Sequence, residues 1–545
     1  MVGEMNVEAL FKQNEIPTIE EYLKRCGVTY PDYLNPKADA NENFDNYDNI
    51  DSAVDLLKES IDMSIKHKKW IVIICDSDCD GYCSSAMAKR FLLEMGVPRK
   101  YILVLFHDGK QHGLSKDILN QINKGLNNNE QIALIWLPDA GTNDVEACGY
   151  YTKCFNIPIL ITDHHIADRP NGYGLIVNNQ TSENVRNKHL CGTGVTHKVI
   201  SAYCKKYDST FQQNVIDLVA LATISDVMDM RSPENRLFVY WGLRHVKTTF
   251  LSGLLEAFIV HDCPTPTALA WDVIPKINAV CRSDDQELKQ ELFNALCDDV
   301  WDEGLIDRLK KCHQAQKQET DELYQEALAM HPMGDKVKIF VLPNTPYSGL
   351  IANKLSEHYG CPCMVVHKSY NKYIGSLRSP CDMKTQLQST HLMTLCMGHE
   401  RACGVGWWQN NTKELIAKCK QLDFTPAPKN VMYSTDNILM SRELFELHDK
   451  YANVWGTGIP EPLIHVSGIE LSGKDIKELG SAKTTIKFMY GDVECIMFFC
   501  SKEKKEKIGV GKDKMIKLEI IGVPSINHFN DKEYKQIVIR DFEVN

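Results

Sequence analysis

The sequence predicts an α/β protein with a doubly wound parallel sheet, a smaller second α/β domain and a C-terminal β-barrel. Unbroken apolar runs at residues 70–75, 132–137 and 157–162 alternate with helical patterns. Such runs are typical of parallel strands that are buried on both faces. A second strand-and-helix alternation begins near residue 336. From residue 424 onward, apolar and polar residues alternate in short segments, which favours a small barrel.

The composition is that of an ordinary globular protein with several domains. A chain of 545 residues is too long for one hydrophobic core, and 43% of its residues are hydrophobic and 24% charged. No apolar run approaches the roughly 20 residues that a membrane-spanning helix needs. The first residues lack the basic start of a secretory signal, and the 20 cysteines form no Cys-x-x-Cys pair. We therefore expect a cytoplasmic protein with free thiols and no membrane partner.

The first three segments lead from a polar extension to a connecting helix. The N-terminal extension, residues 1–65, contains a helical pattern at 52–61. Residues 66–245 alternate strand and helix signals and form the doubly wound domain. Residues 246–335 are helical and end in a long polar stretch at 305–330. We expect that stretch to be a helix that joins two lobes of the protein.

The last two segments form the second α/β domain and the barrel. Residues 336–423 contain a strand pattern at 337–342 and a helical pattern at 350–358. Residues 424–545 form the barrel, which includes a lysine-rich stretch at 502–517. The formal net charge of −11 argues against a protein that coats nucleic acid through charge alone. A local basic rim on the barrel could still hold a phosphate backbone.

Acidic residues follow directly after the apolar runs. Residues 76–81 read Asp-Ser-Asp-Cys-Asp-Gly, residues 138–143 contain Asp-Ala-Gly-Thr-Asn, and residues 163–165 read Asp-His-His. A further apolar run at 218–225, which we interpret as a fourth strand, leads to Asp226. Ligands bind beyond the carboxyl ends of parallel strands, so these side chains are expected to meet in one site.

The residue types in these segments predict a centre for two hard cations. Carboxylates with imidazole and without thiolate suit Mn²⁺ or Mg²⁺ better than structural Zn²⁺. Several carboxylates in one cleft would repel each other without metal, and two ions can activate water and hold a phosphoryl oxygen in hydrolysis. The alternative, that these are ordinary loop and cap residues, explains one segment better than all three together. The expected metal-binding residues are Asp76, Asp78, Asp80, Asp139, His164 and Asp226, with Asp76 either a ligand or a hydrogen-bond acceptor behind the ligands.

These motifs make the chain resemble the DHH phosphoesterase superfamily, and within it the RecJ-like single-strand-specific exonucleases. The segments at 76–81, 139–143 and 163–165 resemble the first three family motifs, and 190–195 and 220–227 resemble later ones. Two segments favour the RecJ-like branch: Asn235-Arg236 and 275–282. Three further segments resemble the DHHA1 domain: 348–352, 375–379 and 398–404. The segment at 455–462 resembles the start of the RecJ OB-fold. The chain departs from the family pattern at His112, Asn179, Cys281 and Met397.

The resemblance also implies roles for other residues. Asp163 would orient an imidazole, and His165 would donate a hydrogen bond or a proton near the reacting phosphoryl group; a buried structural histidine is an equal alternative. Arg282 and Asn278 resemble residues that face the scissile phosphate. The expected pocket for the far end of the substrate consists of Ser376, Arg378, Gly398 and His399. Trp407 and Trp408 could stack on bases or could be core residues.

The resemblance implies a metal-dependent exonuclease that releases mononucleotides from the 5′ end of single-stranded DNA, in repair, recombination or replication. An alternative is a phosphodiesterase of the same superfamily that acts on short oligoribonucleotides or cyclic dinucleotides. A third reading is an inactive replication scaffold, which the complete set of acidic residues disfavours. A single-strand-binding protein or a helicase would be the protein partner, and we expect a monomer.

Overall fold

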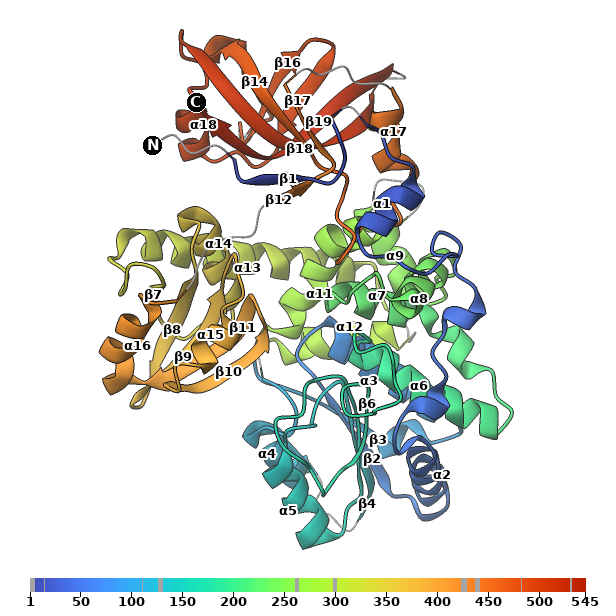
Figure 1. The fold of residues 1–545 in the computed structure, drawn as a ribbon. Coiled ribbons are helices and arrows are strands. Elements are labelled where there is room, and N and C mark those ends of the chain that lie inside the picture. The colour runs from blue at the N-terminus through green and yellow to red at the C-terminus, as the bar shows by residue number, and fades with distance from the viewer. Residues whose placement is uncertain are drawn as a thin grey trace.

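The computed structural model describes residues 5–13, 15–109, 111–125, 131–259, 264–297, 301–422, 429–436, 442–481, 483–529 and 532–545. Figure 1 shows a parallel sheet with its helices at one end of the molecule, a second α/β unit beside a middle layer of helices, and a β-rich domain at the other end. Across the described residues, no helix combines the length and the apolar character that crossing a bilayer requires.

The first sheet confirms the predicted parallel architecture. Its strand order is β3-β2-β4-β5-β6, and every neighbouring pair is parallel. The order places β2 and β4, which precede the first two acidic segments, side by side at the centre. The strands are β2 (Trp70–Cys75), β3 (Ile102–Phe106), β4 (Ile132–Pro138), β5 (Ile159–Asp163) and β6 (Leu175–Asn178).

Helices cover both faces of this sheet, which makes it doubly wound. Ile71 and Ile73 of β2 pack into one core with α2, α3 and α6, whereas Val72 and Ile74 pack into a second core with α4 and α5. Successive side chains of a strand point to opposite faces, so each apolar run supplies both cores. The helices are α2 (Ile50–His67), α3 (Cys79–Glu94), α4 (Lys116–Gly125), α5 (Val145–Phe155) and α6 (Gly192–Lys206).

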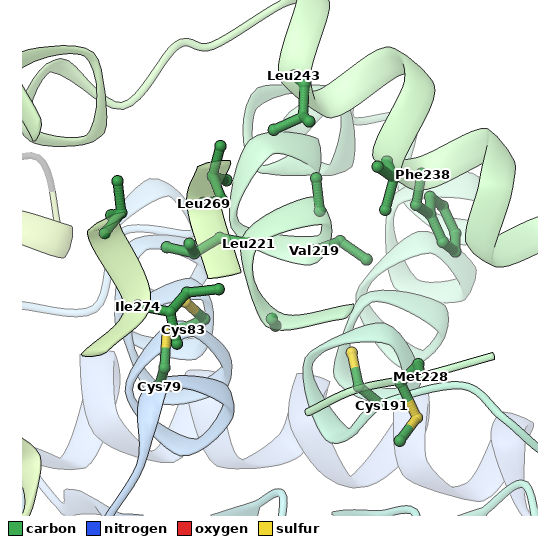
Figure 2. Packing of buried hydrophobic residues seen from close by; sticks show 14 of the residues in the cluster. Cys79, Cys83, Cys191, Val219, Leu221, Met228, Phe238, Leu243, Leu269 and Ile274 are labelled. Carbon is green, nitrogen blue, oxygen red and sulfur yellow. The ribbon is translucent and has the colours of Figure 1, made fainter. Parts of the chain in front are cut away.

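The apolar run before Asp226 is a helix, and its interpretation as a fourth strand is wrong. Helix α7 spans Ile216–Ser225, and Val219 and Leu221 are fully buried. Figure 2 shows these two side chains pointing toward α8 (Pro233–Arg244) and toward α3 and α11 respectively. A helix enclosed on all sides has no polar face, so its sequence carries no period of 3.6 that would separate it from a buried strand.

Helix α3 also begins earlier than the sequence indicates. We expected it from about Ser84, but it starts at Cys79, with Asp78 as its N-cap. Asp78 and Asp80 of the first acidic segment therefore lie at the N-cap and in the first turn of the helix, and Asp76 precedes it. The unpaired N–H groups of a helix start can stabilise carboxylates placed there.

A layer of helices follows, and the long polar stretch is a connecting helix as predicted. Helix α13 (Gly304–Ala329) contacts α11 and α12 of this layer and α14 of the second α/β domain. A short π-helical segment, Leu269–Val273, leads directly into α11. The other helices of the layer are α9 (Thr249–Phe258), α10 (Pro266–Ala268), α11 (Ile274–Cys281) and α12 (Gln286–Leu296).

The second α/β domain is a five-stranded sheet in the order β10-β11-β9-β8-β7, in which only β7 and β8 are parallel. Trp407 is fully buried and belongs to the core, whereas Trp408 is 45% exposed. The strands are β7 (Lys338–Val341), β8 (Cys363–Ser369), β9 (Lys372–Arg378), β10 (Met393–His399) and β11 (Ala402–Trp408), and the helices are α14 (Ser348–Tyr359), α15 (Lys384–Gln388) and α16 (Thr412–Cys419).

The C-terminal domain is a seven-stranded sheet in the order β13-β14-β18-β19-β17-β16-β15. Its two longest strands, β18 (Met515–Phe529) and β19 (Lys532–Val544), form an antiparallel pair that starts at Leu518 of β18. The lysine-rich stretch forms helix α18 (Lys502–Ile508). The other elements are β13 (Tyr433–Thr435), α17 (Arg442–Lys450), β14 (Ile464–Ser472), β15 (Lys477–Leu479), β16 (Thr485–Tyr490) and β17 (Val493–Met497).

The N-terminal extension reaches back to this C-terminal domain, which the sequence did not indicate. Strand β1 (Val7–Ala9) pairs in parallel with β12 (Lys429–Val431). The hydroxyl of Tyr22, on α1 (Ile19–Arg25), donates to the carbonyl of Pro460 at 3.2 Å. The two ends of the chain therefore lie together at the β-rich end of the molecule (Figure 1).

Candidate metal centre

The first acidic segment is held between β2 and two helix starts. The Asp78 carboxylate caps α3 by accepting from the Gly81 N–H at 3.2 Å. The Asp80 carboxylate accepts from the backbone N–H groups of Gly192 and Thr193 at 2.7 and 2.8 Å, which lie at the start of α6. The positive end of a helix favours a negative side chain there. Asp80 is thus held in place at the start of α6.

Two glycines let the segments approach each other closely. A Cβ atom at Gly81 would lie 2.7 Å from the backbone oxygen of Asp76, and one at Gly192 would lie 2.6 Å from the Cα of Asp139. Both distances are too short for any side chain. Glycine at these positions is therefore a condition for bringing the acidic segments into one site.

Asp139 and Asp226 converge with Asp80 on the imidazole of His164. The His164 Nε2 atom lies 3.3 Å from Asp139 Oδ1, 3.4 Å from Asp226 Oδ2 and 3.9 Å from Asp80 Oδ2. Burial and the neighbouring His165 lower the pKa of His164 to about 4. The imidazole is therefore neutral near neutral pH, and its nitrogen can offer a lone pair to a metal ion.

Several buried carboxylate oxygens at this centre have no hydrogen-bond partner among the described residues. They are Asp76 Oδ1, Asp139 Oδ1 and Asp226 Oδ2. Burial and the carboxylates of Asp80 and Asp78 raise the pKa of Asp139 and of Asp226 well above the ordinary value. Buried carboxylates without partners are costly unless a cation neutralises them. The donor set thus fits divalent cations that prefer oxygen and imidazole ligands.

The same side chains form three groups whose ligand atoms lie within 4.8 Å of one another. Two of these groups share no residue: Asp76 with Asp78 and Asp139, and Asp80 with His164 and Asp226. The third joins Asp139 to His164 and His165. All six side chains expected to bind metal therefore lie together, and Asp139 belongs to two of the three groups.

Asp163 turns away from this convergence and orients His165. Its Oδ1 atom lies 2.8 Å from His165 Nδ1, and its other oxygen accepts from the Thr142 N–H at 3.0 Å. Although burial opposes it, the Asp163 carboxylate raises the pKa of His165 to about 10. The His165 side chain is half exposed, so the buried structural histidine that we considered is excluded. It carries a positive charge beside the centre.

Two histidines that the sequence did not single out as site residues flank Asp76. His112 Nδ1 lies 2.6 Å from Asp76 Oδ2, and the buried His107 places its Nε2 atom 3.9 Å from Asp76 Oδ1. His107 directly follows β3, so the strand-end rule applied to the other segments would have found it. His112 lies in a loop and gave no signal except its departure from the family pattern.

The residues expected to face the scissile phosphate take two different positions. The Asn278 side-chain oxygen accepts from the Cys79 N–H at 2.9 Å, so Asn278 helps to hold the start of α3. Arg282 lies at the C-terminal end of α11, and its buried Nε atom has no partner among the described residues. Burial and the Asp76 carboxylate raise the pKa of Asp78, and the positive charge of Arg282 offsets part of that rise.

The second α/β domain brings a further group toward the centre. Burial and the charge of Arg282 lower the pKa of Arg378, and burial and the charge of His165 lower that of His399. The Ser376 hydroxyl hydrogen-bonds that of Ser348 at 2.9 Å. Gly398 has a φ of 122°, which glycine adopts easily. Arg378 thus lies close enough to Arg282, and His399 close enough to His165, for their charges to interact.

Comparisons with known proteins agree with this architecture. Residues 70–223 match the family model described as DHH family, N-terminal domain, and residues 439–541 match the RecJ OB domain. The chain is 26% identical over 571 aligned positions to the SPbeta prophage-derived single-strand DNA-specific exonuclease YorK of Bacillus subtilis, with 96% of this chain and 95% of that protein covered. It is 23% identical to the single-stranded-DNA-specific exonuclease RecJ of Bacillus subtilis, with 90% and 63% covered.

Solved structures share the fold. A crystal structure of RecJ from Thermus thermophilus in complex with Mn²⁺ superposes with a TM-score of 0.70 at 19% identity, over 91% of this chain and 72% of that one. A second, in complex with Mg²⁺, gives a TM-score of 0.68 at 18% identity, over 96% and 74%. Two matched domains, a similar protein along nearly the whole length and a shared fold lead to one conclusion. The chain contains a DHH domain and a RecJ OB domain, and it resembles RecJ-like proteins along nearly its whole length.

Proposed function

We propose that this protein is a metal-dependent exonuclease that hydrolyses single-stranded DNA to mononucleotides from the 5′ end. The observation that carries the proposal is the set of unpartnered, buried carboxylate oxygens around His164. A centre of this kind serves hydrolysis of phosphate esters. The activity named for the similar proteins supports single-stranded DNA as the substrate.

The centre would hold two Mn²⁺ or Mg²⁺ ions, with Asp139 shared between them. Asp76 and Asp78 would complete one site, and Asp80, His164 and Asp226 the other. Ions bound there would lower the pKa of a bound water and polarise the phosphoryl oxygen. The protein's part is to fix the carboxylates through the helix starts and the two glycines, so that little rearrangement is needed on binding.

The charged groups around the centre would act on the phosphate itself. Protonated His165, oriented by Asp163, can donate a hydrogen bond to a phosphoryl oxygen or a proton to the leaving oxygen. The guanidinium of Arg282 can offset the charge that develops in the transition state. Asn278 acts as a positioning residue through the start of α3.

The second α/β domain would supply a pocket that holds the terminal phosphate. Arg378 would provide the positive charge, because a terminal phosphate matches a bidentate guanidinium. His399, whose pKa is lowered, would provide a hydrogen bond, and Ser376 and the Gly398 backbone would shape the pocket. Gripping the strand by its 5′ end would place the first phosphodiester at the metal centre. In this proposal, the pocket sets the direction of cleavage.

A substrate panel tests the proposal. A single-stranded DNA labelled at one end is incubated with Mn²⁺ beside duplex DNA, a matching RNA and a cyclic dinucleotide. Mononucleotides released from the 5′ end of the single strand alone are the expected result. Turnover of only the RNA or the cyclic dinucleotide would instead identify the small-substrate phosphodiesterase, and release from the 3′ end would contradict the proposed pocket.

A further inference from the structure

We propose that a surface beside the metal centre binds the single strand beyond its cleaved end. We call it the Trp271 surface; it consists of Trp271, Phe258, Lys276, Lys310 and Lys317. In this arrangement a base stacks on the Trp271 indole and the lysines hold the flanking phosphates. The inference rests on the proposed function, because it names where the rest of the same substrate lies.

Trp271 is exposed although its neighbours are firmly packed. Its side chain is 75% exposed, whereas Leu269 and Val273 in the same π-helical segment are fully buried. Leu269 and Ile274 belong to the same hydrophobic core as the side chains of α3 and α7, and Figure 2 shows Ile274 beside Cys79 and Cys83 of α3. The indole therefore projects from a rigid base rather than from a loop. π-helical turns of this kind often occur at functional sites.

Positive charge gathers around Phe258, on helix α9, which contacts the π-helical segment that carries Trp271. The ammonium groups of Lys276 and Lys310 lie 4.6 and 5.4 Å from the centre of the Phe258 ring. Lys310, His313 and Lys317 are spaced i, i+3 and i+7 on α13, so they lie along one stripe of that helix. Three lysines on neighbouring helices thus face a common region.

The nearby carboxylates of Asp307 and Asp272 compensate part of this charge. Asp307 lies 3.3 Å from Lys310 in an exposed pair, and exposed pairs of this kind are weak. Lys276 donates to the backbone oxygen of Asp272. Lys276 and Lys317 both act on His313 and add to burial in lowering its pKa. In a protein with a net charge of −11, such a group attracts a polyanion locally.

Helix α11 links this surface to the metal centre. Pro275, Asn278 and Arg282 are spaced i, i+3 and i+7 on one face and are partly exposed, while the opposite face is buried. The path from Trp271 to Arg282 spans eleven residues, roughly 16 Å at the helical rise. A strand with its end at Arg282 would reach Trp271 after a few nucleotides. An exposed indole stacks on unpaired bases, so the occupant is single-stranded and not duplex.

Binding measurements in a hydrolysis-deficient background test the surface. Asp139→Asn protein is titrated into fluorescein-labelled single-stranded DNA of about 20 and about 4 nucleotides. In that background, Trp271→Ala should weaken binding of the long strand between about fivefold and a hundredfold and leave the short strand unchanged. Trp271→Phe, which keeps a stacking ring, should restore most of the affinity.

The contribution of the lysines is tested by the salt dependence of single-strand binding. Lys310→Ala with Lys317→Ala should make the slope of log K against log salt shallower by roughly 0.7 for each phosphate that the protein no longer neutralises. Trp241→Ala, at a partly exposed tryptophan on α8, and Lys66→Ala, on α2, are the matched controls and should change neither quantity.

The outcomes separate this inference from the proposed function. If the parent protein hydrolyses single strands but Trp271→Ala binds the long strand normally, the inference fails alone. If binding depends on Trp271 but no substrate is hydrolysed, the proposed function fails alone. Equal losses on short and long strands, or no binding of the long strand by the Asp139→Asn protein, would also overturn the inference.

Discussion

At the scale of single residues, close backbone approaches bring the carboxylates of the metal centre together. The repulsion between these carboxylates is relieved when a cation binds. Burial and its neighbours raise the pKa of Asp139, while the backbone of Gly192 lies against the same residue. Asp139 is therefore subject both to electrostatic repulsion and to tight packing, and two different substitutions can test these two effects separately.

Asp139→Asn removes one of the crowded carboxylates. We expect hydrolysis to fall below about one percent, while the metal-free protein keeps or gains thermal stability because a buried charge is gone. The melting temperature with and without Mn²⁺ checks this: the parent should gain stability on adding the ion and the variant should gain less. A variant that gains as much as the parent would remove Asp139 from the centre. Asp168→Asn, at an exposed carboxylate nearby, is the control.

Gly192→Ala tests the packing. The new methyl group would lie 2.2 Å from Asp139 Oδ1 and 2.6 Å from its Cα, so the backbone must move. We expect a loss of about 1–3 kcal/mol in stability and a large loss of hydrolysis, measured by thermal unfolding and by the end-label assay. Gly172→Ala, where nothing lies within 4 Å of the added atom, should change neither.

At the scale of elements, chain segments of one composition take different structures according to their surroundings. The strand runs of the first sheet and the run that forms α7 are both largely apolar, yet the strands pair with neighbouring strands whereas α7 packs against α3, α6 and α8. Helix α17 shows how an element end is fixed by charge. His448 lies between Asp449 and Glu461 at 2.8 and 3.2 Å and stacks on Trp455.

This arrangement predicts a pH dependence of stability. Burial opposes it, but the hydrogen bonds to Asp449 and Glu461 raise the pKa of His448 to about 9. Its contribution is therefore complete below about pH 6.5, the ordinary histidine value, and is lost as the pH rises toward 9. The upper limit is about 3 kcal/mol, at 1.36 kcal/mol per unit. The free energy of unfolding should fall over this range in the parent and less in His448→Gln; parallel curves would contradict the assignment.

At the scale of the whole molecule, the C-terminal domain shares a core with the rest. One hydrophobic cluster extends from Ile71 of the first sheet to Trp455 and Ile520. The guanidinium of buried Arg236 donates to the backbone oxygens of Tyr33 and Asn453 at 3.1 and 2.5 Å. The Met230 N–H donates to Thr457. The barrel is thus not an appendage that can be removed without effect.

Removing residues from 424 onward should consequently do two things. Binding of long single strands should weaken, because the OB domain is lost, and the remaining chain should melt at a lower temperature, because Arg236 and the shared core lose partners. Dinucleotide hydrolysis at a temperature well below the new melting point should persist. If hydrolysis of dinucleotide and long strand fell equally there, the domain would not be a grip on the strand.

The sequence by itself determined the parallel sheet, the acidic strand ends and the connecting helix. These follow from local patterns: buried strands read as apolar runs, and ligands collect at their carboxyl ends. The sequence also identified the side chains expected to bind metal, because carboxylate and imidazole residues can be recognised in it directly.

The tertiary structure alone decided that residues 218–225 form a helix, that His112 flanks Asp76, and that β1 pairs with β12. Each depends on contacts between segments far apart in the chain, which leave no periodic signal in either segment. The exposed Trp271 belongs to the same class, since only the packing of its neighbours shows that the indole remains in solvent.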